Sequence, residues 1–245
     1  MAEQYDAIAR EYQRTKQSPL RRYVEAYTLF QLLGDLQDLR VLDLACGEGF
    51  YTRQIMQSGA AAVTGVDISP AMIELAEVCE QQEPLRISYH CRDVAELGRL
   101  GEFDLVSAAY LLHYAPNVEA LQGMCNSIAA NLRPGGRLVA INENPGQGSA
   151  DYAGYLQYGF NKSVQEPRTE GSAITYEMVS GRSLIRFEAF YYSQAVYEAA
   201  LTRAGFTDIR WQPLQLSPEG VVECGADYFQ EYLQNPPVVG LECRL

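Results

Sequence analysis

The sequence predicts an α/β protein whose core is a doubly wound, mostly parallel sheet. Three observations indicate this class: apolar runs of strand length alternate with amphipathic stretches of helix length, the first run ends in a glycine-rich turn, and the next run ends in an acid. At 245 residues the chain is long enough for one domain with a large core and too short for two. We therefore expect a single domain over residues 1–245.

Two helices are expected before the first strand. In residues 2–16, apolar and tyrosine side chains recur at helical spacing, with Tyr5 and Tyr12 on or near one face. A second helix begins at Ser18-Pro19, because proline is well accepted in a first helical turn, and it ends at Gly34.

Residues 41–67 are the clearest strand–helix–strand unit. The apolar run Val41–Leu44 is followed by residues 45–49, Ala-Cys-Gly-Glu-Gly, then by a helical stretch and a second apolar run that ends at Asp67. Ligands of such sheets lie beyond the carboxyl ends of the strands, and small residues there let the backbone approach a ligand closely. Because a carboxylate at Asp67 can bind both hydroxyls of a ribose, the unit predicts a nucleoside site.

The glycine turn departs from a dinucleotide fingerprint in two ways. Thr52 stands where the third glycine of that fingerprint belongs, and Glu48 places a negative charge between the two glycines. A negative charge at this point disfavours a diphosphate. The turn therefore favours a cationic or phosphate-free nucleoside.

Residues 43–49, Asp-Leu-Ala-Cys-Gly-Glu-Gly, and residues 66–69, Val-Asp-Ile-Ser, resemble the motifs of class I S-adenosylmethionine-dependent methyltransferases. That family often has glycine where this chain has Ala45. The resemblance covers residues 5–142 well and the remainder by topology. It implies a Rossmann-like sheet of seven strands with the last strand antiparallel, S-adenosyl-L-methionine as methyl donor, S-adenosyl-L-homocysteine as product and a small-molecule acceptor.

The resemblance also implies which residues bind the cofactor. An N-terminal lid over residues 1–34 would close an aromatic side chain, Tyr12, over the cofactor; alternatively, the tyrosines of this segment only pack the helix on the core. The other cofactor-binding residues implied near the first two strands are Ala45, Cys46, Gly47, Asp67, Ile68 and Met72. Of these, Ile68 and Met72 would flank the adenine.

The third and fourth strands are expected at Ile87–Cys91 and Phe103–Ala108. After the third strand, the resemblance gives Asp93, beside Val94, a hydrogen bond from the adenine amino group; the alternative is that Asp93 only caps the following turn. After the fourth strand, the backbone of Ala108 and Ala109 would bind the methionine amino group.

The segment after the fourth strand holds the candidates for the acceptor pocket, Tyr110, His113 and Tyr114. Tyr110 and His113 are the candidate catalytic residues. His113 is one of only two histidines, and a lone histidine can equally be structural, so both interpretations stay open.

The remaining core elements follow the same alternation. We expect a helix at Val118–Leu132, a strand at Arg137–Asn142, a helix at Ser193–Ala204, a strand at Phe206–Gln212 and an antiparallel edge strand at Val238–Arg244.

Residues 143–193 form an insertion after the fifth strand. They contain a tyrosine-rich cluster and two β-like runs, Ser172–Val179 and Ser183–Tyr191, which predict a hairpin. An insertion here lies over the strand ends, so we expect it to cover the acceptor. The candidate acceptor-binding residues in it are Tyr158, Asn161 and Tyr191. Either the aromatic side chains stack on a flat ring or they pack a small subdomain.

The amino-acid composition indicates which classes of binding partner are unfavourable for this protein. Nineteen Lys and Arg stand against 31 Asp and Glu, a formal charge of −12, which disfavours nucleic acid and acidic membranes. Six cysteines without a C-x-x-C pair and only two histidines predict no metal site. No basic leader and no apolar run of about 20 residues is present. We expect a cytoplasmic monomer or homodimer.

The methyl of the donor is already activated, so a ring nitrogen needs little base catalysis, whereas a hydroxyl needs a base. No histidine–acid pair is evident, which favours N-methylation of a flat heteroaromatic. Residues 4–12 and 158–161 also look similar to methyltransferases of azapteridine (toxoflavin-type) antibiotic biosynthesis. The alternatives are an O-methyltransferase with His113 as base and a non-catalytic nucleoside-binding protein.

Overall fold

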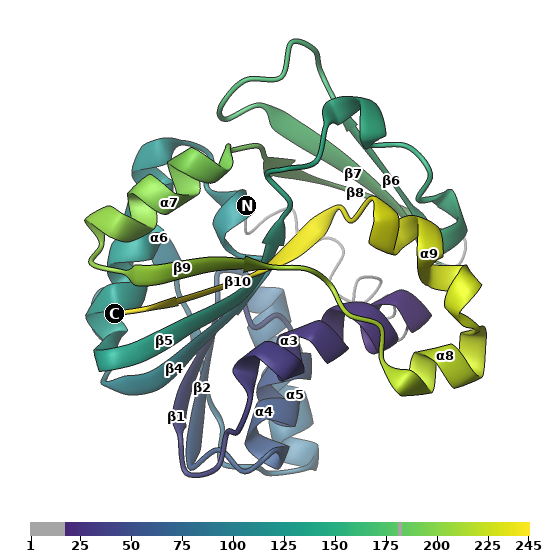
Figure 1. Cartoon of the computed structure of the whole chain (residues 1–245). Helices are drawn as coiled ribbons and strands as arrows, with labels where there is room; N and C mark the ends of the chain where they lie inside the picture. Colours follow the sequence, from purple (N-terminus) through teal and green to yellow (C-terminus); the bar gives the residue numbers. More distant parts are fainter. Residues whose placement is uncertain (1–17, 181–182) are drawn as a thin grey trace.

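The computed structural model describes residues 18–180 and 183–245, and its core is one seven-stranded sheet (Figure 1). The strand order is β3-β2-β1-β4-β5-β10-β9, with β1 to β5 parallel and β10 antiparallel to both of its neighbours. The strands are β1 (Arg40–Leu44), β2 (Ala62–Asp67), β3 (Ser88–Cys91), β4 (Phe103–Ala109), β5 (Leu132–Glu143), β9 (Thr207–Gln212) and β10 (Val238–Arg244). This confirms the predicted Rossmann-like, mostly parallel sheet with an antiparallel last strand.

The predicted edge position of the last strand was wrong. β10 pairs with β5 on one side and β9 on the other, so β9 is the edge strand. The residue types explain this order: β10 carries the apolar Val238 and Leu241 and is largely buried, whereas β9 is polar and exposed along much of its length. A strand that pairs on both sides needs the more apolar sequence.

Helices cover both faces of the sheet (Figure 1). On one face lie α3 (Tyr27–Leu33), α4 (Phe50–Gln57) and α5 (Pro70–Gln82), and on the other lie α6 (Val118–Asn131) and α7 (Gln194–Arg203). Side chains alternate along β1, so that Val41 packs in one core cluster and Leu42 and Leu44 pack in the other. Ser69 caps α5 as its sequence predicts, since its Oγ accepts a hydrogen bond from the Met72 N–H at 3.2 Å.

The helix predicted from residue 18 contains an irregular turn. Residues Arg21–Ala26 form a π-helical segment, η1, directly before α3. Five of its six residues are buried, Arg21 and Glu25 among them. π-Helical turns are rare and frequently lie at functional sites.

The insertion forms a second sheet of three antiparallel strands, in the order β6-β7-β8. The predicted hairpin is present as β7 (Ala173–Ser180) and β8 (Ser183–Phe190), and the sequence analysis missed its partner β6 (Phe160–Val164). Short 3₁₀ turns precede β6 at η4 (Ser149–Asp151) and η5 (Leu156–Tyr158), and others follow β3 at η2 (Val94–Glu96) and β4 at η3 (Leu112–Tyr114).

Two helices that were not predicted lie between β9 and β10, namely α8 (Pro218–Cys224) and α9 (Ala226–Gln234). Figure 1 shows α9 between the three-stranded sheet and the α3 region. Tyr158 of the insertion donates its hydroxyl to the Tyr228 carbonyl of α9 at 2.9 Å. Elements from three parts of the chain therefore enclose the space beyond the strand ends. No helix among residues 18–180 and 183–245 is long and apolar enough to cross a membrane.

Candidate active site

The chain reverses its strand order between β1 and β4, which are neighbours in the sheet. In open α/β sheets, ligands bind beyond the carboxyl ends of the strands at such a point. The segments that follow these two ends are the glycine turn after β1 and Tyr110 after β4. The structure therefore puts the predicted cofactor and acceptor segments at the same edge of the sheet.

Asp67 ties the glycine turn to the end of β2. Its Oδ2 accepts a hydrogen bond from the Gly47 N–H at 2.8 Å, and its Oδ1 accepts one from the Ser69 N–H at 2.9 Å. Burial raises the pKa of Asp67, while these two N–H groups act in the opposite direction. The turn itself needs left-handed backbone at Ala45, Gly47 and Gly49, with φ of 56°, 56° and 84°.

Little of the described chain approaches Gly47. Within residues 18–180 and 183–245, a Cβ added to Gly47 would meet only the Met72 Sδ, at 4.0 Å. The opposite holds at Gly49, where an added Cβ would lie 2.5 Å from the Tyr89 hydroxyl. Gly49 therefore allows Tyr89 to pack on the turn, and Gly47 leaves room for a ligand.

The electrostatics of the turn fit a cationic ligand. Glu48 is only 4% exposed, and neither of its carboxylate oxygens has a hydrogen-bond partner among residues 18–180 and 183–245. Asp43, five positions before Glu48 in the sequence, is also buried, and it accepts a hydrogen bond from the Thr52 Oγ1 at 2.6 Å. Because a buried carboxylate without a partner is costly, a positively charged ligand would stabilise this turn. The residues present therefore suit a nucleoside that carries a positive charge.

The other predicted cofactor residues lie around this turn in different environments. Met72 is buried and Ile68 partly buried. Asp93 is exposed, and its Oδ1 accepts a hydrogen bond from the Ala95 N–H at 2.8 Å, which caps η2. Val94 is buried in the core. Cys46 is buried too, and burial raises the pKa of its thiol. Tyr12 lies outside the described residues.

β4 ends in the buried Ala108 and Ala109, and the chain turns sharply at Tyr110. Tyr110 has a φ of 66°, a left-handed conformation that is uncommon for a tyrosine, and its N–H donates to the Ile141 carbonyl at 2.8 Å. This turn directs Tyr110 into a cavity beyond the strand ends.

The cavity is mostly aromatic. Three predicted acceptor-site residues that follow β4 line it, and so does Tyr158 of the insertion. Its aromatic lining comprises Tyr110, His113, Tyr114, Tyr158, Phe160, Tyr176, Phe187 and Tyr232. The predicted Asn161 and Tyr191 are not part of the lining. Asn161 points away because its strand neighbours Phe160 and Lys162 occupy the inner face of β6, and Tyr191 instead packs under Arg168, 3.8 Å from its ring centroid.

Two charged side chains that the sequence analysis missed, Arg21 and Glu25, also line the cavity. Glu25 accepts hydrogen bonds from two tyrosines: Tyr232 donates to Oε1 at 2.7 Å, and Tyr110 donates to Oε2. Burial raises the pKa of both tyrosines, and the Glu25 charge adds to the shift. The apolar stripe of the predicted helix does not include Glu25, and the π-helical turn that brings it to the cavity has no recognised sequence signal.

His113 is buried, and burial lowers its pKa. Its Nδ1 lies 3.1 Å from both the Glu143 N–H and the Asn142 Oδ1. One ring nitrogen cannot donate and accept at once, so only one of these two contacts is a hydrogen bond in a given neutral tautomer. The Asn142 amide keeps its orientation, because its Nδ2 donates to the Glu143 carbonyl at 3.1 Å. Nδ1 therefore accepts from the Glu143 N–H in one tautomer of the ring and donates to the Asn142 Oδ1 in the other.

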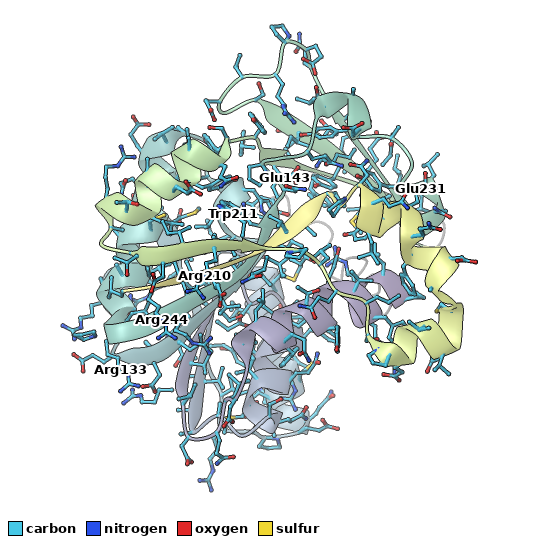
Figure 2. The ribbon with its side chains drawn as sticks, in the orientation of Figure 1. Arg133, Glu143, Arg210, Trp211, Glu231 and Arg244 are labelled. Atoms are coloured by element: carbon cyan, nitrogen blue, oxygen red, sulfur yellow. The ribbon has the colours of Figure 1, made fainter. Side chains whose placement is uncertain are left out.

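A buried ion pair joins the main sheet to the insertion. Lys162 of β6 donates to Glu143 at the end of β5, and the two side chains are 0% and 2% exposed. Lys162 also donates to the Gln147 Oε1 at 2.7 Å, and the Tyr176 hydroxyl donates to the Glu143 Oε2 at 2.5 Å. Figure 2 shows Glu143 where the two sheets meet. The ion pair thus fixes one cavity tyrosine in place.

Across residues 18–180 and 183–245, no three His, Cys, Asp or Glu side chains are grouped in a way that could hold a metal ion.

Comparisons with known proteins agree with this fold. Residues 41–136 match the family model described as a methyltransferase domain. A structure of an S-adenosylmethionine-dependent methyltransferase from Mesorhizobium loti superposes with a TM-score of 0.65 at 19% sequence identity, and the match covers 94% of this chain and 100% of that one. At this level of identity, the structural likeness concerns the fold.

Two curated relatives are similar over different shares of the chain. A ubiquinone biosynthesis O-methyltransferase from Coxiella burnetii is 36% identical over 112 residues, which is 44% of this chain and 46% of that protein, so the alignment spans less than half of its length. An N-demethylindolmycin N-methyltransferase from Streptomyces griseus is 27% identical over 180 residues, which is 73% of each protein.

Proposed function

We propose that this chain, which has the class I methyltransferase fold, is an S-adenosylmethionine-dependent methyltransferase that acts on a small-molecule acceptor. The observation that carries the proposal is the shared sheet edge: a glycine turn tied to Asp67, with the buried carboxylate of Glu48, lies at the same edge as an aromatic cavity. The first feature suits a cationic nucleoside, and the second suits a flat acceptor.

In this proposal the residues of the turn bind the cofactor. Asp67 binds the ribose hydroxyls through the carboxylate lone pairs that its two N–H partners leave available. Ile68 and Met72 flank the adenine, and Asp93, whose Oδ1 accepts from the Ala95 N–H, accepts a hydrogen bond from the adenine amino group through its other oxygen. When bound, S-adenosylmethionine supplies a methyl group on a positively charged sulfur.

The end of β4 positions the methionine part of the cofactor. The backbone of Ala108 and Ala109 meets the β1 turn at the point where the strand order reverses, and Glu48 offsets the positive charge. Ala45, Cys46 and Gly47 allow close approach of the backbone. Positioning of donor and acceptor in this way can contribute on the order of 7 to 11 kcal/mol to the rate enhancement.

We further propose that the acceptor is a flat heteroaromatic, such as an azapteridine, and that a ring nitrogen is methylated. Tyr110, Tyr114 and Tyr158 supply aromatic faces for stacking. Methylation of such a nitrogen needs little base catalysis, so it does not depend on the tautomer of His113. The N-methyltransferase relative from Streptomyces griseus is consistent with this choice. Residues 143–193 and 1–34 would cover the acceptor and the cofactor, respectively.

The second candidate is O-methylation, which the similarity to the Coxiella burnetii O-methyltransferase favours. Here Nδ1 of His113 would donate to the Asn142 Oδ1, and Nε2 would accept the hydroxyl proton. The variant His113→Ala separates the two: a loss of several orders of magnitude in turnover with acceptor binding intact would favour O-methylation, whereas N-methylation predicts a modest loss.

Calorimetry with S-adenosylhomocysteine, followed by an acceptor screen with S-adenosylmethionine, tests the proposal. We expect binding at one site and turnover on small aromatic acceptors. Binding without turnover on any acceptor would indicate a non-catalytic nucleoside-binding protein, and absence of binding would contradict the proposed function.

A further inference from the structure

We infer that Glu25 is the residue that binds the reacting end of the acceptor, and that it accepts a proton from an acceptor nitrogen. The acceptor class is therefore a molecule with an N–H at the methylated atom, either a protonated aryl amine or an N–H heteroaromatic ring. This inference rests on the proposed function and specifies its substrate class.

Glu25 lies next to the expected position of the methyl group. It is only 6% exposed, yet it lines the cavity. Its Oε2 accepts a hydrogen bond from the hydroxyl of Tyr110, which follows directly after β4, and its Oε1 accepts one from the hydroxyl of Tyr232 in α9 at 2.7 Å. The carboxylate is thus held from two sides, next to the strand end where the activated methyl is expected.

The Glu25 carboxylate has hydrogen-bonding capacity beyond these two contacts. Each oxygen of an ionised carboxylate has two acceptor sites, and the two tyrosines use one site on each oxygen. The phenol hydroxyls donate here, so they cannot also donate to the acceptor. The remaining sites can accept a hydrogen bond from a further donor, and an N–H group of the acceptor would supply one.

The charges of the cavity also bear on the acceptor. Arg21, the other charged residue among the described lining residues, pairs with Glu25 at 3.9 Å from its Nε, and its guanidinium lies 5.2 Å from the Tyr110 ring centroid. The Glu25 carboxylate repels an anion, and tyrosine rings attract positive charge at their faces. An acceptor with a positive charge or an N–H dipole therefore suits the end of the cavity beside Glu25 better than a phenolate or a carboxylate.

The backbone around Glu25 is irregular. Glu25 and Arg21 lie in the π-helical turn η1, where Tyr23, Val24 and Ala26 are also buried. Burial of charged side chains is costly, and π-helical turns are rare and frequently lie at functional sites. The turn is the element that brings both side chains to the cavity.

In the proposed step, the acceptor nitrogen gives its proton to a Glu25 carboxylate oxygen. The lone pair of the nitrogen then forms the new bond to the methyl carbon. The carbon–sulfur bond breaks, and its electron pair stays on the sulfur of S-adenosylhomocysteine. Glu25 afterwards releases the proton to solvent.

The test compares Glu25→Gln with wild-type enzyme on a panel of flat aromatic compounds in matched pairs, each an N–H heterocycle or aryl amine and its phenol or carboxylate counterpart. S-Adenosylhomocysteine formation reports turnover, and calorimetry with S-adenosylhomocysteine reports the cofactor site. We expect wild-type turnover on the nitrogen members. Glu25→Gln should lower kcat/KM for them by at least 100-fold and change the S-adenosylhomocysteine Kd by less than threefold.

Two further variants separate this role from a structural one. Tyr232→Phe keeps the carboxylate and removes one of its donors, so we expect a loss of only 3- to 10-fold. Glu223→Gln is the matched control, because Glu223 also accepts a tyrosine hydroxyl, that of Tyr23, but lies outside the cavity lining. It should behave as wild type.

Turnover confined to the phenol or carboxylate members would overturn the inference, as would unchanged turnover in Glu25→Gln. Retained S-adenosylhomocysteine binding with no turnover on any member would also overturn the acceptor class while leaving the cofactor site intact. If wild-type protein did not bind S-adenosylhomocysteine, that result would instead contradict the proposed function itself.

Discussion

Asp67 is the residue on which cofactor binding depends most. It holds Gly47 and Ser69 through backbone N–H groups and, as proposed, also binds the ribose. Asp67→Ala removes both roles, so we expect S-adenosylhomocysteine binding to weaken by about 1 to 3 kcal/mol, the usual scale for loss of a buried hydrogen-bonding partner. Calorimetry measures this change.

Asp35→Ala is the control for this prediction. Asp35 is exposed and also accepts a backbone N–H, that of Gln37, at 3.0 Å. Its replacement should leave the affinity unchanged. If folded Asp67→Ala bound with wild-type affinity, Asp67 would not belong to the site.

His113 predicts a pH dependence of stability. Burial lowers its folded pKa, so below the unfolded value of about 6.5 the unfolded chain binds more protons at this residue than the folded chain does. The free energy of unfolding should therefore fall as the pH drops from 7 to 5, with a contribution of up to about 1.4 kcal/mol per pH unit from this side chain. This contribution is fully present above pH 7.

Urea denaturation between pH 5 and 8 measures that dependence. In His113→Gln the slope should decrease, whereas His90→Gln, which changes the other histidine, should keep the wild-type slope. An identical slope in wild type and His113→Gln would show that His113 is not held neutral by burial.

The junction between the two sheets depends on one ion pair. Lys162→Met leaves Glu143 buried without its cation, and we expect a loss of roughly 3 to 5 kcal/mol in the free energy of unfolding. The double variant Lys162→Met/Glu143→Leu removes both charges and should lose less than Lys162→Met alone. A urea double-mutant cycle measures the coupling, and additive losses would contradict it.

The elements of the main sheet could be predicted because each strand is an apolar run with a clear boundary. The Val41–Leu44 run and the Ser69-Pro70 helix start are local signals, and both are present. The neighbour order of β9 and β10 is not local, because it depends on which strand buries more surface. β6 and the α8–α9 pair were missed since their residues mix polar and aromatic side chains without a clear period.

The candidate site likewise has a part that local sequence signals predicted and a part that they did not. The glycine turn and Asp67 are close in sequence and carry recognisable motifs, so they were predicted and are in contact. The acceptor cavity collects residues from η1, β4, the insertion and α9, which no spacing rule connects. Glu25 and Tyr232 are 207 positions apart yet share a hydrogen bond, so only the tertiary structure reveals them.

At the scale of the whole molecule, two segments lie over one edge of the main sheet. The main sheet provides the strand ends, while the β6–β8 sheet and α9 enclose the space beyond them (Figure 1). A scaffold of this kind can hold the donor site rigidly while the enclosing segments determine which acceptor fits. We therefore expect differences in acceptor between relatives of this fold to lie in these segments.

A crystal structure grown with S-adenosylhomocysteine tests the central claim most directly. We expect the adenosine beside Met72 with its ribose on Asp67, and the sulfur beyond the end of β4, facing Tyr110 and Glu25. Ligand bound elsewhere, or a sulfur that faces away from the aromatic cavity, would contradict the claim that one sheet edge joins donor and acceptor.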